Sequence, residues 1–286
     1  MDKGTFFCKK NTLNCKGKIL NLEHPIVMGI LNLTPDSFYD GGAYKSLDDI
    51  LKRVDQMLME GAKIIDIGAM TTKPGAGLIS YEDELSRLLP ALKLIVKKFP
   101  DVIISVDTFR SNIAEVVINE GASMINDISA GDMDDKMFEK IVRLDVPYII
   151  MHMQGIPQTM QKNPEYTDVV KEIIFYLSNK VNKLNQMGAK DIIIDPGFGF
   201  GKTVDHNFQL LKNLKTFAFF GLPVLVGISR KSMINNVLQI KPSDALNATS
   251  ILNTISLMNG ANILRVHDVK EAVESIKLVE KYNQSA

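Results

Sequence analysis

The chain has 286 residues, of which 45% are hydrophobic and 23% charged, a composition typical of a globular protein. Its 33 lysine and arginine residues balance its 33 aspartate and glutamate residues, which excludes the basic field expected of a nucleic-acid or anionic-membrane binder. Two cysteines, Cys8 and Cys15, are too few for a disulfide framework and are not spaced as zinc ligands, which indicates two reduced thiols.

The first 25 residues precede the first strand pattern and form a predicted N-terminal extension, 1–25. They contain no apolar core of the length found in signal peptides, and no later run approaches the ~20 apolar residues of a membrane span. We therefore expect a cytoplasmic protein without a membrane or nucleic-acid partner. Segment 13–22 alternates around Lys16-Gly17, which predicts a β-hairpin that closes the bottom of a barrel.

From residue 26 onward, short β-branched runs alternate with amphipathic stretches. The runs cover 26–33, 64–69, 102–107, 124–128, 147–153, 192–195, 224–229 and 263–267. Helical spacing is clearest over 47–60, 81–98, 111–120, 169–187 and 245–259. Several of these stretches end in Gly-Ala, where a left-handed glycine ends a helix: Gly61, Gly121, Gly188 and Gly260.

Eight such βα units in about 250 residues predict a (β/α)₈ TIM barrel over residues 26–286. An open doubly wound sheet is the alternative, although such sheets usually have fewer strands. In a TIM barrel the chemistry lies at the C-terminal ends of the strands. In this chain those ends carry polar side chains almost throughout: Asn32, Asp66, Asp107, Asn126, Asp127, His152, Asp195, Ser229, Arg230, Lys231, Arg265 and His267.

The types of these side chains indicate a ligand. Asp66, Asp127 and His152 we interpret as structural, since polar residues at strand ends often serve caps and rim hydrogen bonds. Asp195 and Asn126 together can pair with the edge of an amino-pyrimidinone ring. Cationic side chains follow the last two strands, where barrels commonly hold a phosphate, namely Arg230, Lys231, Arg265 and His267. Asn32 and Asp107 offer oxygen atoms to a hard cation such as Mg²⁺.

The stretch DPGFGFGKT, residues 195–203, resembles a nucleotide-binding loop at first sight. A P-loop would need glycine where Pro196 stands, and the dinucleotide pattern would need its third glycine at Lys202. We interpret the stretch instead as a strand that delivers Asp195 to a glycine-rich turn. Lys202 and Thr203 then belong to the start of the following helix.

Eight motifs in order resemble the dihydropteroate synthase family, from about residue 26 to the end. They are MGILNLTPDSFYDGG (28–42), TTKPGA (71–76), SVDTFR (105–110), INDISAG (125–131), MHMQGIPQTM (151–160), DPGFGFGK (195–202), GISRKSMI (227–234) and LRVHDV (264–269). The resemblance implies a transferase of folate biosynthesis and a target of sulfonamides. It would join 6-hydroxymethyl-7,8-dihydropterin diphosphate to p-aminobenzoate, and it would act as a homodimer.

The resemblance also implies roles for matching residues. The implied catalytic residues are Asp107, Asp195, Lys231 and Arg265. The implied contacts to the pterin diphosphate are Asp107, Asn126, Asp195, Lys231, Arg265 and His267, with Met151 and Phe200 beside the ring. Asn32 would bind Mg²⁺. The p-aminobenzoate site would consist of Phe38, Thr72, Lys73 and Pro74, with Ser232 near the carboxylate.

One motif departs from the family pattern, because Lys73 stands where arginine is common and Ala69-Met70 where Gly-Glu is frequent. Lysine keeps the positive charge but loses the planar bidentate fork. Two other functions remain open at this point. A pterin-binding methyltransferase domain would share Asn126 and Asp195 but would not need the diphosphate cluster of Asn32, Arg265 and His267. A folate-binding barrel without catalysis is the other.

Overall fold

The computed structural model describes residues 10–33, 47–70 and 77–285. Its central feature is a parallel sheet of eight strands in the order β8-β7-β6-β5-β4-β3-β10-β9. The sheet closes where Ile194 at β8 bridges Val224 and its amide donates to the Pro223 carbonyl at 3.0 Å. The strands are β3 (Ile26–Asn32), β4 (Ile64–Gly68), β5 (Ile103–Asp107), β6 (Met124–Asp127), β7 (Tyr148–Met151), β8 (Ile192–Asp195), β9 (Leu225–Val226) and β10 (Ile263–Val266).

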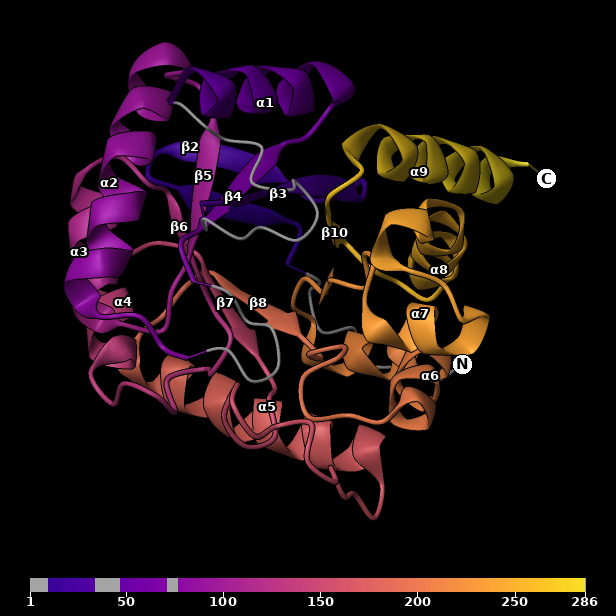
Figure 1. Ribbon diagram of the computed structural model, residues 1–286. Coiled ribbons are helices and arrows are strands. Elements are labelled where there is room, and N and C mark those ends of the chain that lie inside the picture. The colour runs from indigo at the N-terminus through magenta and orange to yellow at the C-terminus, as the bar shows by residue number, and fades with distance from the viewer. Residues whose placement is uncertain (1–9, 34–46, 71–76, 286) are drawn as a thin grey trace, which may run out of the picture.

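Helices surround this barrel and follow its strands in turn (Figure 1). The predicted (β/α)₈ TIM barrel is therefore confirmed. In the described part of the chain the helices are α1 (Leu47–Glu60), α2 (Tyr81–Lys98), α3 (Ser111–Asn119), α4 (Met137–Leu144), α5 (Val169–Met187), α6 (Val204–Lys212), α7 (Ser232–Leu238), α8 (Leu246–Met258) and α9 (Val269–Gln284). Two 3₁₀ segments, η1 (Leu214–Phe220) and η2 (Pro242–Asp244), complete them.

The Gly-Ala pairs end helices as predicted, because Gly61, Gly121, Gly188 and Gly260 all have φ between 93° and 110°. The largest departure from the predicted runs is at 224–229, where the ladder contains only Leu225 and Val226. No described helix is long and apolar enough to span a membrane.

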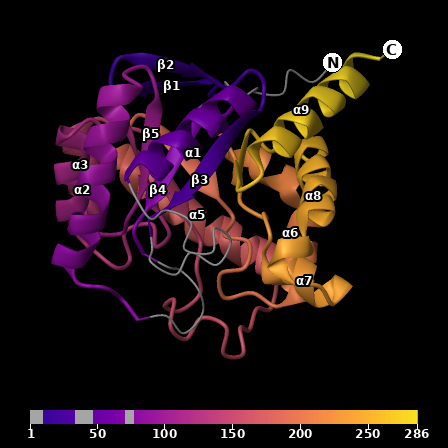
Figure 2. The same cartoon turned by 45° about the horizontal axis from the view of Figure 1, so that its top comes forward.

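A hairpin of β1 (Thr12–Cys15) and β2 (Lys18–Asn21) closes one end of the barrel, at the top of Figure 2. Lys16 and Gly17 have φ of 55° and 88°, the left-handed pair that a two-residue hairpin turn requires. The apolar face of the hairpin packs against inward-facing residues of the strands in one cluster, so the predicted plug is confirmed. Its members are Leu13, Cys15, Leu20, Leu22, Ile26, Met28, Ile64, Ile103, Met124, Ile149, Ile193, Leu225 and Ile263.

Cys15 lies inside this cluster and is fully buried. Burial raises the pKa of its thiol to about 12, so the side chain behaves as a small apolar group rather than as a nucleophile. Cys8 lies outside the described residues.

Candidate active site

The barrel interior changes from apolar to polar between one layer of side chains and the next. Side chains on a strand alternate between the two faces, so residues two positions apart point the same way. The residues two positions after the buried Ile64, Met124, Ile193 and Ile263 therefore also face inward. They are Asp66, Asn126, Asp195 and Arg265, which places a polar layer directly above the apolar plug.

Arg265 on β10 links the carboxylates of β4 and β5. Its Nε donates to Asp66 Oδ2 at 2.7 Å, and one terminal nitrogen donates to Asp107 Oδ2 at 3.0 Å. Asn126 joins the same group, since its Nδ2 donates to Asp66 Oδ2 at 3.2 Å. The Arg265 guanidinium thus orients both Asp66 and Asp107, and Asp66 in turn orients the Asn126 amide. Four residues from four strands form a single hydrogen-bonded unit.

The charges of this unit are poorly matched, because one guanidinium faces two carboxylates. Burial raises the pKa of Asp107 to about 7, and the opposing attraction of Arg265 does not cancel that effect. For Arg265, burial lowers the pKa, but Asp66 and Asp107 outweigh it and raise the pKa above its usual value. Arg265 is therefore always charged, whereas Asp107 can exchange a proton near neutral pH.

Asp195 and Lys231 lie beside this unit, close enough for the charge of Arg265 to act on both, and both contact the glycine loop that follows β8. The Gly197 amide donates to Asp195 Oδ1 at 2.7 Å, and Lys231 Nζ donates to the Phe198 carbonyl. Lys231 Nζ also lies 4.6 Å from the centroid of the Phe200 ring. Burial lowers the pKa of Lys231 to about 8, although Asp195 acts in the opposite direction. Burial likewise raises the pKa of Asp195, with Lys231 opposing.

An apolar wall stands beside these groups. Met151 and Phe200 form one buried cluster with Ile128 and Met160. Met151 and Phe200, both predicted to lie beside a ring-binding pocket, thus have their side chains in one cluster.

The cationic residues after the last two strands divide into two kinds. Arg230 makes a bidentate ion pair with Asp268 at 2.9 and 2.7 Å, and donates further to the carbonyls of Pro242 and Ser243. This buried guanidinium joins three segments of the barrel and does not belong with the phosphate-binding group to which the sequence analysis assigned it. His267 Nδ1 lies 3.0 Å from Ser229 Oγ. Burial and the nearby Arg265 lower the pKa of His267 to about 3, so its imidazole is neutral at physiological pH.

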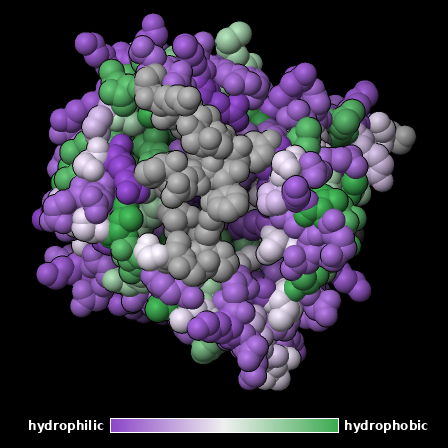
Figure 3. Space-filling model, in the orientation of Figure 1, coloured by the Kyte–Doolittle hydropathy of each residue, from purple (hydrophilic) through white to green (hydrophobic). Residues whose placement is uncertain are grey.

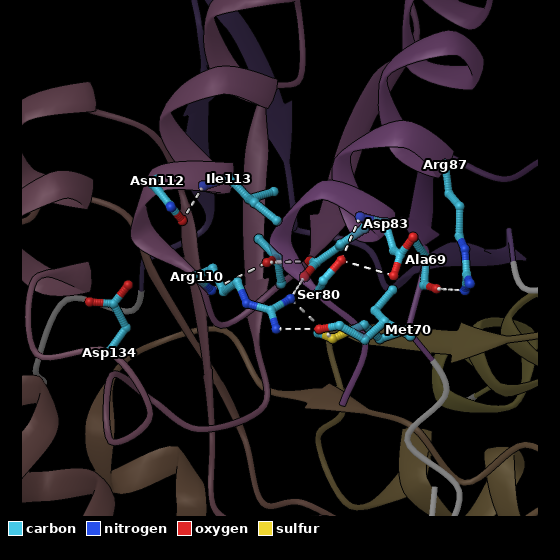
Figure 4. A network of polar contacts seen from close by, with 12 residues as sticks. Ala69, Met70, Ser80, Asp83, Arg87, Arg110, Asn112, Ile113 and Asp134 are labelled. Atoms are coloured by element: carbon cyan, nitrogen blue, oxygen red, sulfur yellow. Dashed lines mark hydrogen bonds and ion pairs between the residues drawn. The ribbon is translucent and has the colours of Figure 1, made fainter. Parts of the chain in front are cut away.

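The base of the β4–α2 connection is fixed by two arginines (Figure 4). Arg110 donates to the Ile79 carbonyl at 2.6 Å and approaches Met70 Sδ at 3.7 Å, so it contacts both ends of the connection. Arg87 on α2 donates to the Ala69 carbonyl at 3.2 Å. Arg110 is itself held by an ion pair with Glu84, which is fully buried.

Of the five residues predicted for the p-aminobenzoate site, the structure describes one. Phe38, Thr72, Lys73 and Pro74 lie outside the described residues. Ser232 is described and exposed, as the first residue of α7 after Lys231.

Asn32, the predicted metal ligand, ends β3 opposite Gly68 of β4 and is half-buried. Asp107, at the same level of β5, also pairs with Gly68 in register. The described residues contain no group of three His, Cys, Asp or Glu side chains that could hold a metal ion by themselves.

Two residues of this region make contacts that could not be specified from the sequence. Asp66, interpreted as structural, contacts both Arg265 and Asn126. The available signal was a carboxylate between isoleucines on a buried strand, which needs a cationic partner. Lys202, assigned to a helix start, is 3% exposed, and only Thr203 caps α6. Asp127 is structural as predicted, because it accepts hydrogen bonds from the Ser129 and Gly131 amides and from the Tyr148 hydroxyl.

Comparisons with known proteins agree with this geometry. A family model described as "Pterin binding enzyme" matches residues 28–267. Dihydropteroate synthase of Escherichia coli K12 is 45% identical over 270 residues, which cover 94% of this chain and 95% of that protein.

Two solved structures extend the likeness to three dimensions. The Yersinia pestis dihydropteroate synthase in complex with a sulfonamide drug has a TM-score of 0.92 and 40% identity, and the match covers 96% of this chain and 100% of that one. The Xanthomonas albilineans dihydropteroate synthase with 4-aminobenzoic acid has a TM-score of 0.89 and 34% identity, with 96% and 99% covered. The chain therefore belongs to the pterin-binding enzyme family and, within it, to the dihydropteroate synthases.

Proposed function

We propose that the protein joins 6-hydroxymethyl-7,8-dihydropterin diphosphate to p-aminobenzoate, which yields 7,8-dihydropteroate and diphosphate. The observation that carries the proposal is the polar layer at the barrel mouth. It brings together a carboxylate and an ammonium (Asp195, Lys231) and a guanidinium linked to two acids (Arg265). We also propose that the reaction takes place in the cytoplasm, in line with the bacterial dihydropteroate synthases that the chain resembles.

Recognition of the pterin would fall to Asp195, Asn126 and Lys231. A carboxylate accepts from the N–H groups of an amino-pyrimidinone ring, and an amide and an ammonium donate to its nitrogen and oxygen atoms. Asp195 is 6% exposed and Asn126 4% exposed, so these hydrogen bonds would form away from bulk water, where they discriminate strongly. Met151 and Phe200 would cover the ring face.

The diphosphate would lie toward Arg265 and His267. Arg265 supplies a permanent positive charge, and neutral His267 can donate one hydrogen bond to a phosphate oxygen. Asn32 fits Mg²⁺, because its amide oxygen is a hard ligand and Mg²⁺ commonly takes few protein ligands and completes its shell with phosphate oxygens and water. When bound there, Mg²⁺ would offset negative charge on the departing diphosphate.

The chemical step breaks the bond between the methylene carbon and the diphosphate oxygen, and the electron pair leaves with the diphosphate. We propose that departure comes first, so that the positive charge left on carbon spreads into the dihydropterin ring, where Asp195 would offset it. The lone pair of the arylamine nitrogen then forms the new C–N bond, and the nitrogen loses its proton to solvent. An arylamine is uncharged at neutral pH, so no strong general base is needed.

The p-aminobenzoate contacts of Phe38, Thr72, Lys73, Pro74 and Ser232 stay predictions. Thr72, Lys73 and Pro74 belong to the β4–α2 connection, which follows the C-terminal end of β4. Arg110 and Arg87 bind the two ends of this connection, which supports a role for it at the mouth. Lys73 would pair with the substrate as a point charge, without the bidentate geometry of arginine.

A turnover assay tests the proposal. Purified protein with Mg²⁺, pterin diphosphate and p-aminobenzoate should release dihydropteroate and diphosphate in equal amounts, and chelation of Mg²⁺ should suppress both. Binding of the pterin without turnover would indicate a non-catalytic barrel. Methyl transfer from a folate to a cobalamin protein would indicate the methyltransferase, which the Arg265 and His267 cluster argues against. A sulfonamide added to the assay tests drug sensitivity.

The titration of Lys231 predicts a pH limit for catalysis. Because its lowered pKa is about 8, the ammonium that would donate to the pterin is lost as the pH rises through 8. We expect kcat/KM for pterin diphosphate, which reports the free enzyme, to fall about tenfold per pH unit above that value. In K231R this limb should disappear below pH 10, because a guanidinium stays protonated. Rate profiles from pH 6 to 10 for both proteins test this, and identical alkaline limbs would exclude Lys231 as their source.

We also propose a homodimer that uses the outer face of α7 and α8. On α8 the residues Ile251, Ile255 and Met258 are 52%, 37% and 48% exposed and follow helical spacing. Val237 and Leu238 of α7 are also exposed, and Figure 3 shows hydrophobic side chains gathered over these two helices at the right of the view. A second copy that covered the stripe would explain this apolar surface.

The dimer predicts a mass near twice the 31.8 kDa of one chain by light scattering. The variant I251E should give the monomer mass, since a charge within this apolar face would be buried unpaired in the dimer. F175E is the matched control, because Phe175 on α5 is 70% exposed but lies on another helix. A monomeric wild type, or an I251E protein that stays dimeric, would contradict the proposed interface.

A further inference from the structure

Lys202, the last residue of the motif DPGFGFGK, is a buried lysine that the proposed reaction does not use. Its Nζ donates to the carbonyl oxygens of Gly197, Phe200 and His152 at 2.8, 3.0 and 3.3 Å, and lies 3.0 Å from His152 Nδ1. An ammonium has three N–H donors and no acceptor, so it suits a site made of carbonyls and an imidazole nitrogen. The imidazole is neutral, because burial and the charge of Lys202 lower the pKa of His152 to about 2.

These partners belong to two different loops. His152 follows β7, whereas Gly197 and Phe200 follow β8. The loops are pressed together, since a Cβ on Gly197 would lie 1.9 Å from the His152 carbonyl oxygen and one on Gly201 2.6 Å from that of Gln154. Burial lowers the pKa of Lys202 well below its usual value, yet its N–H groups donate to three converging carbonyls whose dipoles would otherwise repel one another.

The loop that Lys202 holds is also the loop that presents the proposed pterin-binding groups. Its Gly197 amide orients Asp195, its Phe198 carbonyl accepts from Lys231, and its Phe200 ring lies beside the Lys231 ammonium. Lys202 makes no hydrogen bond to the side chains of Asp195, Lys231 or Phe200, but it binds the backbone on both sides of Phe198. Movement of Gly197 or Phe200 would therefore change the positions of Asp195, Lys231 and the ring together.

We propose that Lys202 is a positioning residue, which clamps the glycine loop between β8 and α6 in the one conformation that presents Asp195, Lys231 and Phe200 to the pterin ring. The inference rests on the proposed pterin site and adds a residue that acts on that site through the backbone. The glycines at 197, 199 and 201 all have positive φ, of 76°, 81° and 62°, which lets the loop turn tightly enough to direct the Gly197 and Phe200 carbonyls toward Lys202.

The test compares K202M with K212M in steady-state kinetics. Methionine keeps the length of the side chain but removes the charge and the donors, and Lys212 is an exposed lysine on the same loop-to-helix segment. We expect K202M to raise the KM for pterin diphosphate by about 10- to 100-fold, since misplacement by about 1 Å costs that much. The KM for p-aminobenzoate should change less than twofold, and amide hydrogen exchange over 196–201 should accelerate. K212M should match the wild type.

A folded K202M protein with both KM values within twofold of the wild type would overturn the proposal. Equal increases in both KM values would also overturn it, because they would indicate a general structural role. If K202M does not fold, K202R decides: its larger planar head fits four convergent acceptors poorly, so a pterin KM raised at least threefold supports the clamp and unchanged kinetics refute it. An inactive wild type would instead refute the proposed function, and normal kinetics of D195N would refute the pterin site.

Discussion

Replacement of Asp195 by asparagine should lower kcat/KM for pterin diphosphate by about 10²- to 10³-fold, in the range of a lost charge-stabilising group in an active site. The amide keeps the size of the side chain but presents an NH₂ group to ring N–H donors and carries no charge to offset the cation. Because burial already raises the pKa of Asp195, removal of its charge should leave the free energy of unfolding equal or higher. Steady-state kinetics and thermal unfolding of the same preparation measure both effects.

The matched control for this substitution is D205N, because Asp205 is an exposed acid in the first turn of α6, close in sequence to the same loop. D205N should keep wild-type kinetics. A D195N enzyme with a near-normal rate would show that the carboxylate does not recognise the pterin, and the assignment of Asn126 and Lys231 to the same ring would lose its main support.

Replacement of Arg265 by methionine should abolish detectable turnover and also destabilise the fold. The two carboxylates of Asp66 and Asp107 would lose their shared cation, and the break of a buried ion pair typically costs about 3–5 kcal/mol of unfolding free energy. Turnover would fail for a separate reason, since the diphosphate would lose its permanent positive partner. Chemical denaturation and the product assay report the two effects independently.

The double variant R265M/D66N separates stability from catalysis. Without the Asp66 charge, part of the lost unfolding free energy should return, while turnover should not. R265K is the conservative control: it keeps the charge but not the two-sided fork, so it should be more stable than R265M and still slow. Recovery of activity in the double variant would show that Arg265 serves the fold alone.

The barrel could be predicted from the sequence because its physical cause is local. Runs such as residues 192–194 are buried on both faces and therefore uniformly apolar. The glycines at 61, 121, 188 and 260 adopt the left-handed conformation that ends a helix, which a single residue type is enough to indicate. The hairpin could be predicted for the same reason, because the adjacent residues Lys16 and Gly17 specify its turn. Two-residue β9 was less predictable, because the ladder at barrel closure depends on Ile194, thirty residues earlier in the chain.

The site was predictable only in part, because pairings between distant residues leave little trace in one sequence. Position alone pointed to Asp195 and Arg265 at strand ends. Position in the sequence could not indicate that Arg230 forms an ion pair with Asp268. Nor could it indicate that Arg265 donates to Asp66, which lies on a strand about 200 residues away in sequence. Lys202 was hardest to interpret, since its partners are backbone carbonyls, which every residue carries.

A crystal structure with pterin diphosphate and Mg²⁺ tests the central claim most directly. We expect the amino-pyrimidinone edge of the ring within hydrogen-bonding distance of Asp195 and Asn126, and the diphosphate beside Arg265, His267 and Asn32. A diphosphate cradled instead by the glycine loop at residues 196–202, with the ring directed away from Asp195, would contradict it.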